Sequence, residues 1–188
     1  MKKLNLKKVL VPMTLVLMLM VMSFSLAACG GGETSDVNEV DEVMESATLV
    51  EVNTEQGISL MLPSDLTLQE NNGYANMETG ESVMILPLPS DGTVLSDYTE
   101  EDILAIYQPT HENIAIDDFA TGVDINGNEG LIAVCSLTTP GGNAIILTLV
   151  VVNDGTTDYL VNYIYGSDKL DGSLAQNIEA SIDSITIQ

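Results

Sequence analysis

The stretch AIILTLVVV, from Ala144 to Val152, decides the fold of this chain. Successive side chains of a β-strand point to opposite faces of its sheet, and here both sets are apolar apart from Thr148. A strand that is apolar on both faces has to be covered on both sides. The stretch therefore predicts an internal, central strand with a layer of structure packed against each face.

Similar segments lie on either side of this stretch and are separated by short turns. The predicted strands are Ile114–Ile125, Glu129–Thr138 and Asp158–Tyr165. The first of these turns, Asn126-Gly127, is a strong signal for a two-residue hairpin. Because hairpin-length connections join antiparallel strands, the second half of the chain is predicted to be an antiparallel meander.

Four shorter strands are predicted nearer the N-terminus. They are Thr48–Asn53, Ile58–Leu62, Gly73–Met77 and Ser82–Leu86, the last one ended by Pro87. They belong to the same domain as the meander, because the sequence shows neither a repeat nor a second domain.

Two segments have helical periodicity. Residues 100–108 form the first predicted helix, with Thr99 as its N-cap and acidic residues in its first turn. Residues 168–182 form the second, because apolar residues recur every four positions from Leu170 to Ile182. Ile185–Ile187 adds a short final strand. The predicted fold class is α+β, an antiparallel sheet sandwiched between helices.

The N-terminus has the plan of a secretory signal peptide. Residues 1–8 carry four lysines, an apolar run follows to Ala28, and the run ends in Leu-Ala-Ala-Cys with Cys29 last. This ending is typical of a lipobox, in which cleavage between Ala28 and Cys29 exposes a cysteine that receives lipid. A plain transmembrane helix is the alternative, since about 20 apolar residues are long enough to span a bilayer.

The predicted domains follow from this cleavage. Residues 1–28 are the lipoprotein signal peptide, residues 29–46 a lipidated, flexible, acidic tether, and residues 47–188 a single domain. After cleavage the chain keeps one basic residue, Lys169, against 28 acidic ones. Nucleic acid is therefore excluded as a partner, because phosphate binding needs Lys and Arg. An acidic surface favours solubility, cationic partners or divalent ions.

The sequence predicts no catalytic residue, no metal site and no cofactor. Cys135 lies in an apolar strand and is predicted to be a buried, inert thiol. His111, the one histidine, is predicted to be a surface or helix-cap residue. The loop from Asp124 to Gly130 lacks the spacing of an EF-hand and fits a tight turn better. The pair Asp117-Asp118 is predicted to point to opposite faces of its strand.

Three tyrosines are the candidate site residues of the domain. Tyr159, Tyr163 and Tyr165 occupy alternate positions of one predicted strand, so they share one face. Two interpretations remain open: they line a groove and give it polar tips, or they pack under a helix with their hydroxyls at its rim.

The chain also resembles the Mog1/PsbP-like superfamily, including the small bacterial lipoproteins related to PsbP and DcrB. The residues that carry the resemblance are Gly57–Pro63, Ile125-Asn126-Gly127 with Gly130, Tyr159–Tyr165, and Ile182–Ile185. They span about residues 48–187 as a pattern rather than a sharp signature. The resemblance implies a helix–sheet–helix fold and an accessory or binding role. It implies no catalytic motif, and no metal or partner residue of that family is placed on this chain.

The leading functional hypothesis is a membrane-tethered, extracytoplasmic lipoprotein that acts as a non-catalytic accessory or binding module. The expected location is the outer face of the cell membrane, with the N-terminal lipid as anchor and another envelope protein as partner. The alternatives are an envelope enzyme that uses paired carboxylates and a lipoprotein that binds a small ligand or a divalent ion.

Overall fold

The computed structural model describes residues 48–69, 73–169 and 172–188. The predicted signal peptide, its cleavage site, Cys29 and the predicted tether lie outside the described residues. Within the described part of the chain, no helix is long and apolar enough to span a bilayer.

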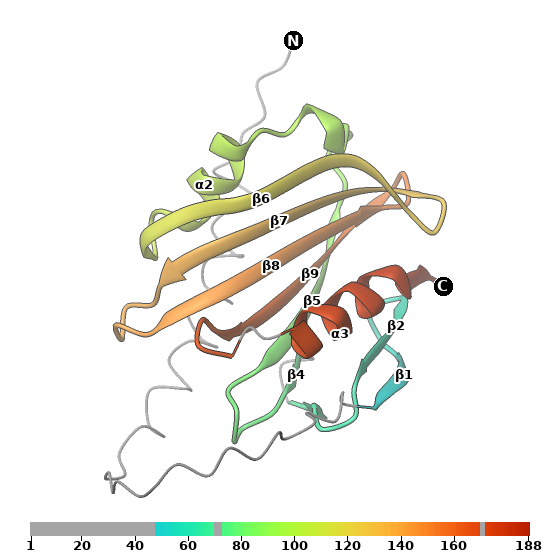
Figure 1. Cartoon of the computed structure of the whole chain (residues 1–188). Coiled ribbons are helices and arrows are strands. Elements are labelled where there is room, and N and C mark those ends of the chain that lie inside the picture. Colours follow the sequence, from blue (N-terminus) through green and yellow to red (C-terminus); the bar gives the residue numbers. More distant parts are fainter. Residues whose placement is uncertain (1–47, 70–72, 170–171) are drawn as a thin grey trace, which may run out of the picture.

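A large antiparallel sheet forms the centre of the molecule (Figure 1). Its seven strands have the spatial order β3-β4-β5-β9-β8-β7-β6. They are β3 (Thr67–Leu68), β4 (Gly73–Ala75), β5 (Ser82–Pro89), β6 (Glu112–Ile125), β7 (Asn128–Thr138), β8 (Ala144–Asn153) and β9 (Thr157–Gly166). The predicted meander is confirmed as β6 to β9, with antiparallel pairing throughout.

The apolar stretch that begins at Ala144 lies in β8, beside the middle strand β9. Its residues from Leu147 to Val152 are buried, as the two-sided apolar pattern predicts. Their side chains divide between two cores. Leu147, Leu149 and Val151 belong to one, and Val150 and Val152 belong to the other.

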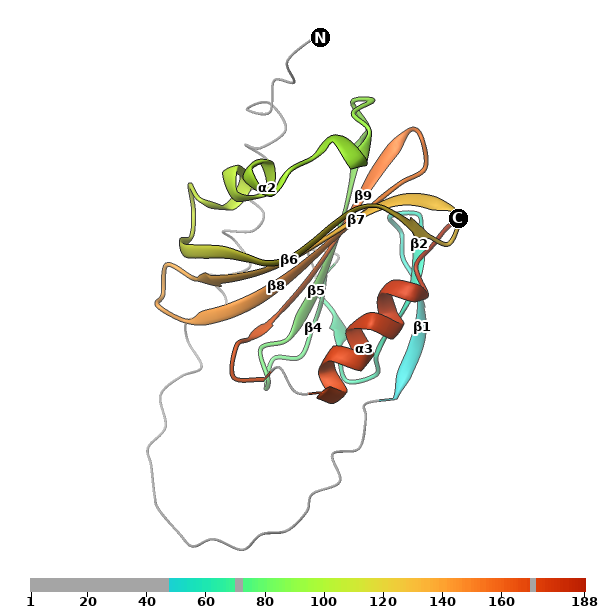
Figure 2. The ribbon, with the colours of Figure 1, turned by 45° about the horizontal axis from the view of Figure 1, so that its top comes forward.

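Helices lie on opposite sides of the large sheet (Figure 2). The short helix α2 (Glu100–Tyr107) follows a short 3₁₀ turn, η2 (Leu95–Asp97), and both contribute buried side chains to the first core. The C-terminal helix α3 (Gly172–Asp183) packs against the second core. Thr99 caps α2 in a reciprocal capping box with Asp102, which confirms it as the N-cap.

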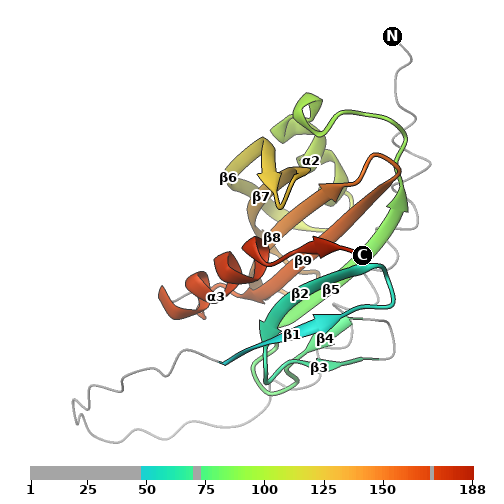
Figure 3. The ribbon, with the colours of Figure 1, turned by 90° about the vertical axis from the view of Figure 1, so that its right-hand side faces the viewer.

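A second sheet shares the face that α3 covers (Figure 3). It consists of β1 (Leu49–Asn53), β2 (Ile58–Pro63) and β10 (Thr186–Ile187), in the order β1-β2-β10. β2 contributes Ile58, Leu60 and Leu62 to the second core. The fold is therefore α+β and mostly antiparallel sheet, with one face of the large sheet covered jointly by a helix and a small sheet.

The predicted end of β5 at Pro87 is wrong, because the strand continues to Pro89. β4 pairs with β5 only from Ser82 to Met84, whereas β9 pairs with β5 along its whole length. Beyond Met84, β5 is thus an edge strand. Proline, which has no N–H to donate, is tolerated on such an edge.

The hairpin at Asn126-Gly127 has a second role that could not be predicted from its sequence. Both residues have positive φ, 51° and 85°, as a tight two-residue turn requires. The Asn126 side-chain amide then donates to the backbone carbonyls of Asp183 and Ile185, at 2.8 and 2.7 Å. The turn thereby fixes the C-terminal end of α3 to the large sheet.

Candidate binding cleft

The three candidate tyrosines share one face of β9, as their alternation predicts, and all three are buried. Tyr163 shares a hydrogen bond of 2.9 Å with Ser181 of α3. Tyr165 is 3.4 Å from Thr148 Oγ1, on the neighbouring strand. Burial raises the pKa of Tyr163 well above its usual range, so its hydroxyl stays protonated. The tyrosines thus pack beneath α3 and the small sheet.

A small cavity remains between α3, β5 and β9. Its volume is about 30 Å³, and Tyr163 and Tyr165 line it together with Leu174 and Ile178. A cavity of this size has room for about one or two water molecules. It is too small for an organic ligand.

Replacing Tyr163 with phenylalanine should lower the free energy of unfolding by about 1 kcal/mol, because it leaves the buried Ser181 hydroxyl without its partner. Tyr165→Phe is the matched control, since its hydroxyl contact is longer, at 3.4 Å, and should cost less. Urea denaturation of both variants measures the difference. Equal losses of unfolding free energy in the two variants would show that the Tyr163–Ser181 hydrogen bond contributes no more to stability than the longer Tyr165–Thr148 contact.

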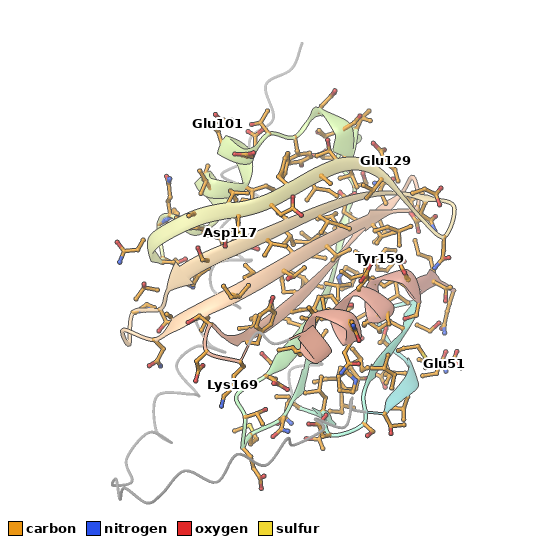
Figure 4. The ribbon with its side chains drawn as sticks, in the orientation of Figure 1. Glu51, Glu101, Asp117, Glu129, Tyr159 and Lys169 are labelled. Carbon is orange, nitrogen blue, oxygen red and sulfur yellow. The ribbon has the colours of Figure 1, made fainter. Side chains whose placement is uncertain are left out.

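A much larger cleft lies at the end of the sheet where β9 ends. Its volume is about 580 Å³, within the range of roughly 300–1,000 Å³ typical of ligand sites. Three segments form it: the β4–β5 turn at Met77–Gly80, the β7–β8 turn with the start of β8 at 139–145, and the end of β9 at 164–168. In Figure 4 the labelled Lys169 marks this end of β9. Of the three candidate tyrosines, only Tyr165 reaches this cleft.

A buried polar contact lies on the opposite face of the sheet, beneath α2. The Tyr107 hydroxyl donates to Asn162 Oδ1 at 3.4 Å, and Asn162 is fully buried in the middle of β9. Among the described residues, the Asn162 side-chain nitrogen has no hydrogen-bond partner. Cys135 is buried in the same core, and burial raises the pKa of its thiol to about 12. The thiol is therefore a core group, as predicted, and not a nucleophile.

His111 is not a surface residue, which corrects one half of the prediction. It is only 7% exposed, and its ring packs edge-on against Tyr107. Its backbone N–H donates to the Tyr107 carbonyl at 3.0 Å, so its main chain caps the end of α2. Burial lowers the pKa of His111, which favours the neutral ring.

The acidic side chains show no metal-binding arrangement among the described residues, where no three His, Cys, Asp or Glu side chains group around one point. The register of β6 shifts between Ile116 and Asp118. This bulge breaks the strict alternation of the strand at these two residues. Asp117 and Asp118 are both exposed. Their predicted assignment to opposite faces stays a prediction.

Comparisons with known proteins place this architecture. No protein-family model and no curated protein matches the chain. Solved structures do match. A mutant of the protein Mog1 is 10% identical with a TM-score of 0.54, and the match covers 74% of this chain and 96% of that one. CyanoP, the PsbP of the cyanobacterium Synechocystis, is 14% identical with a TM-score of 0.53, covering 87% and 99%.

A third similar structure is LpqN of Mycobacterium tuberculosis, described as involved in cell envelope biogenesis. It is 14% identical with a TM-score of 0.51, and the match covers 75% of this chain and 91% of that one. The chain thus has the Mog1/PsbP-like fold, as its sequence pattern indicates. At these identities the likeness shows the fold alone.

Proposed function

We propose that this protein is a membrane-tethered, extracytoplasmic lipoprotein that acts as a non-catalytic accessory or binding module for another envelope protein. The lysine-rich head, the apolar run and Cys29 support the anchor. The similarity to LpqN, an envelope protein by its description, is consistent with this location. In its finer description the domain is a helix–sheet–helix sandwich, with the small sheet completing the layer of α3.

The observation that carries the binding role is the cleft of about 580 Å³ at the end of the large sheet. Turns form most of its wall, and binding residues occur preferentially on loops that a rigid scaffold holds in place. Met77, at its rim, is 57% exposed and offers an apolar contact there. A scaffold with an exposed apolar side chain at an open cleft suits recognition better than chemistry.

Site-specific photo-crosslinking in intact cells tests this role. A photo-reactive residue at Met77 should capture one envelope protein, whereas the same residue at Val94 should not. Val94 is a matched control, because it is also a large exposed apolar residue, at 48% exposure. Val94 lies at the end of the sheet away from the cleft. Two residues later, the Ser96 backbone N–H donates to Glu129 Oε1, at the start of β7, whereas the cleft lies where β7 ends. Equal capture at both positions, or none at either, would count against the proposal.

One observation favours the enzyme alternative. Burial raises the pKa of Asp158, a hydrogen bond from Asn153 opposes this, and the nearby carboxylates of Asp91 and Asp154 raise it further. A carboxyl group with a raised pKa beside other carboxylates is the pattern of a general acid. An envelope enzyme of this kind would lose all activity on a screened substrate in the Asp158→Asn variant and keep it in Asp118→Asn.

A further inference from the structure

The cleft exists because β9 continues past the start of β5. The last pair between these strands joins Ser82 of β5 to Ile164 of β9. Tyr165 and Gly166 follow, and both are paired with β8 on the other side. The pairing of β5 therefore stops two residues before β9 ends, and the space beside these two residues stays open.

The walls of this cleft combine apolar surface with negative charge. Ile145, Ile164 and Tyr165 form its inner part, and Met77 stands at its rim. The charged side chains that line it are all acidic, namely Glu78 in the β4–β5 turn and Asp168 after β9. They come from different segments, so a cation between the walls would meet negative charge on both sides.

Lys169, the next residue in the chain, places a cation beside Asp168. Its Nζ lies 4.0 Å from Asp168 Oδ2, and both side chains are well exposed, at 50% and 78%. Exposed pairs of this kind are weak, and solvent competes with them readily. A partner's cation can therefore replace Lys169 at Asp168.

The net charge of the protein disfavours anionic ligands in the cleft. The whole chain has a formal net charge of −23, so an anionic ligand would be repelled on approach and a cationic one attracted. The volume of the cleft, about 580 Å³, leaves room for apolar side chains of the ligand beside the cation. We propose that the cleft binds an exposed segment of the partner protein in which an arginine or lysine is flanked by apolar residues. This inference rests on the proposed function and names the chemistry of its partner.

Peptide binding to the full protein, purified from cells in nanodiscs of zwitterionic lipid, tests this inference. The probe is acetyl-Ser-Leu-Arg-Leu-Ser-amide, and the control is the same peptide with citrulline, a neutral analogue of nearly equal shape, in place of arginine. Methyl-¹³C methionine reports the site. The Met77 signal should shift on titration, and that of Met84, which is only 2% exposed in the core, should not.

The arginine peptide should bind about three- to tenfold more tightly than the citrulline peptide, the effect expected of two exposed carboxylates. The double variant Glu78→Gln/Asp168→Asn should remove this difference. Lys169→Gln, which removes the competing cation, should instead tighten binding of the arginine peptide by about twofold. Glu101→Gln/Asp118→Asn, two exposed acids outside the cleft, should leave the affinity unchanged.

Equal affinity of the two peptides would overturn the cationic preference, as would an arginine peptide that leaves the Met77 signal unmoved. Neither result would touch the proposed function, which the crosslinking from Met77 and Val94 tests by itself. Loss of the difference in the Glu101/Asp118 control would also overturn the inference, because it would assign the effect to overall charge.

Discussion

Replacing Cys29 with alanine should abolish fatty-acid labelling of the protein and leave it 28 residues longer than the mature form. The thiol of Cys29 is the predicted acceptor of the lipid, and cleavage before it depends on that cysteine. The expected change is all-or-none. Two or more acyl chains are needed for stable anchoring, because one chain alone binds a membrane only marginally. Labelling with radioactive palmitate and mass spectrometry of the purified protein measure both effects.

The second cysteine of the chain provides the control. Cys135→Ala should keep full labelling and the mature mass, because Cys135 is buried in the folded domain. The same experiment tests the alternative of a plain transmembrane helix. A helix that remains uncleaved would give wild-type and Cys29→Ala proteins of equal length, neither carrying lipid, and this result would remove the lipoprotein assignment together with its location.

Strand periodicity predicted most of the described fold correctly. β8 is apolar on both faces, and it is internal and covered by two cores. The turn at Asn126-Gly127 set the register of the β6–β7 hairpin, in which Ile125 pairs with Asn128. Both helices were predicted, because capping at Thr99 and the four-residue spacing of α3 are local signals. The start of the second was predicted too early, since Asp168 and Lys169 are not helical and α3 is Gly172–Asp183.

Pairings between distant segments escaped prediction. A final strand was predicted, and β10 confirms it, but its partner was not predicted, because Thr186 and Ile187 pair with β2, more than 100 positions earlier. The bulge at Asp117 and the edge position of Pro87 likewise depend on the neighbouring strands. His111 is polar and follows a proline-containing turn, so its sequence indicated exposure, but it is buried and its ring packs against Tyr107.

Two of the three segments that form the cleft could have been placed together from the sequence, but the cleft was not predicted. In an antiparallel meander, the β7–β8 turn and the end of β9 must lie at the same end of the sheet. This alternation of strand direction brings residues 139–145 and 164–168 to the same end of the sheet. The position of the β4–β5 turn beside them could not be deduced, because the pairing of β5 with β9 bridges a long stretch of sequence.

The largest expected effect on stability belongs to Asn162→Asp. Asn162 is fully buried, and its side-chain nitrogen has no hydrogen-bond partner in the part of the chain that the structure describes. A carboxylate at this position would be desolvated, and burial of this degree raises a carboxyl pKa by about 3–5 units. At about 1.4 kcal/mol for each unit, the variant should lose about 4 kcal/mol or more of its free energy of unfolding at pH 7. That is a large part of the roughly 5–15 kcal/mol typical of a domain.

The stability loss of Asn162→Asp should increase with pH. A folded-state pKa above the unfolded value of about 3.9 means that the folded variant holds its proton longer. The loss in the free energy of unfolding, relative to wild type, should therefore be small near pH 4 and grow by about 1.4 kcal/mol for each pH unit above it. Urea denaturation of wild type and variant from pH 4.5 to 7.5 measures this difference. Asn143→Asp, at an exposed turn position, should show no such slope. A constant difference across this pH range would mean that water or a rearranged neighbour solvates position 162, and that the core beneath α2 is not dry.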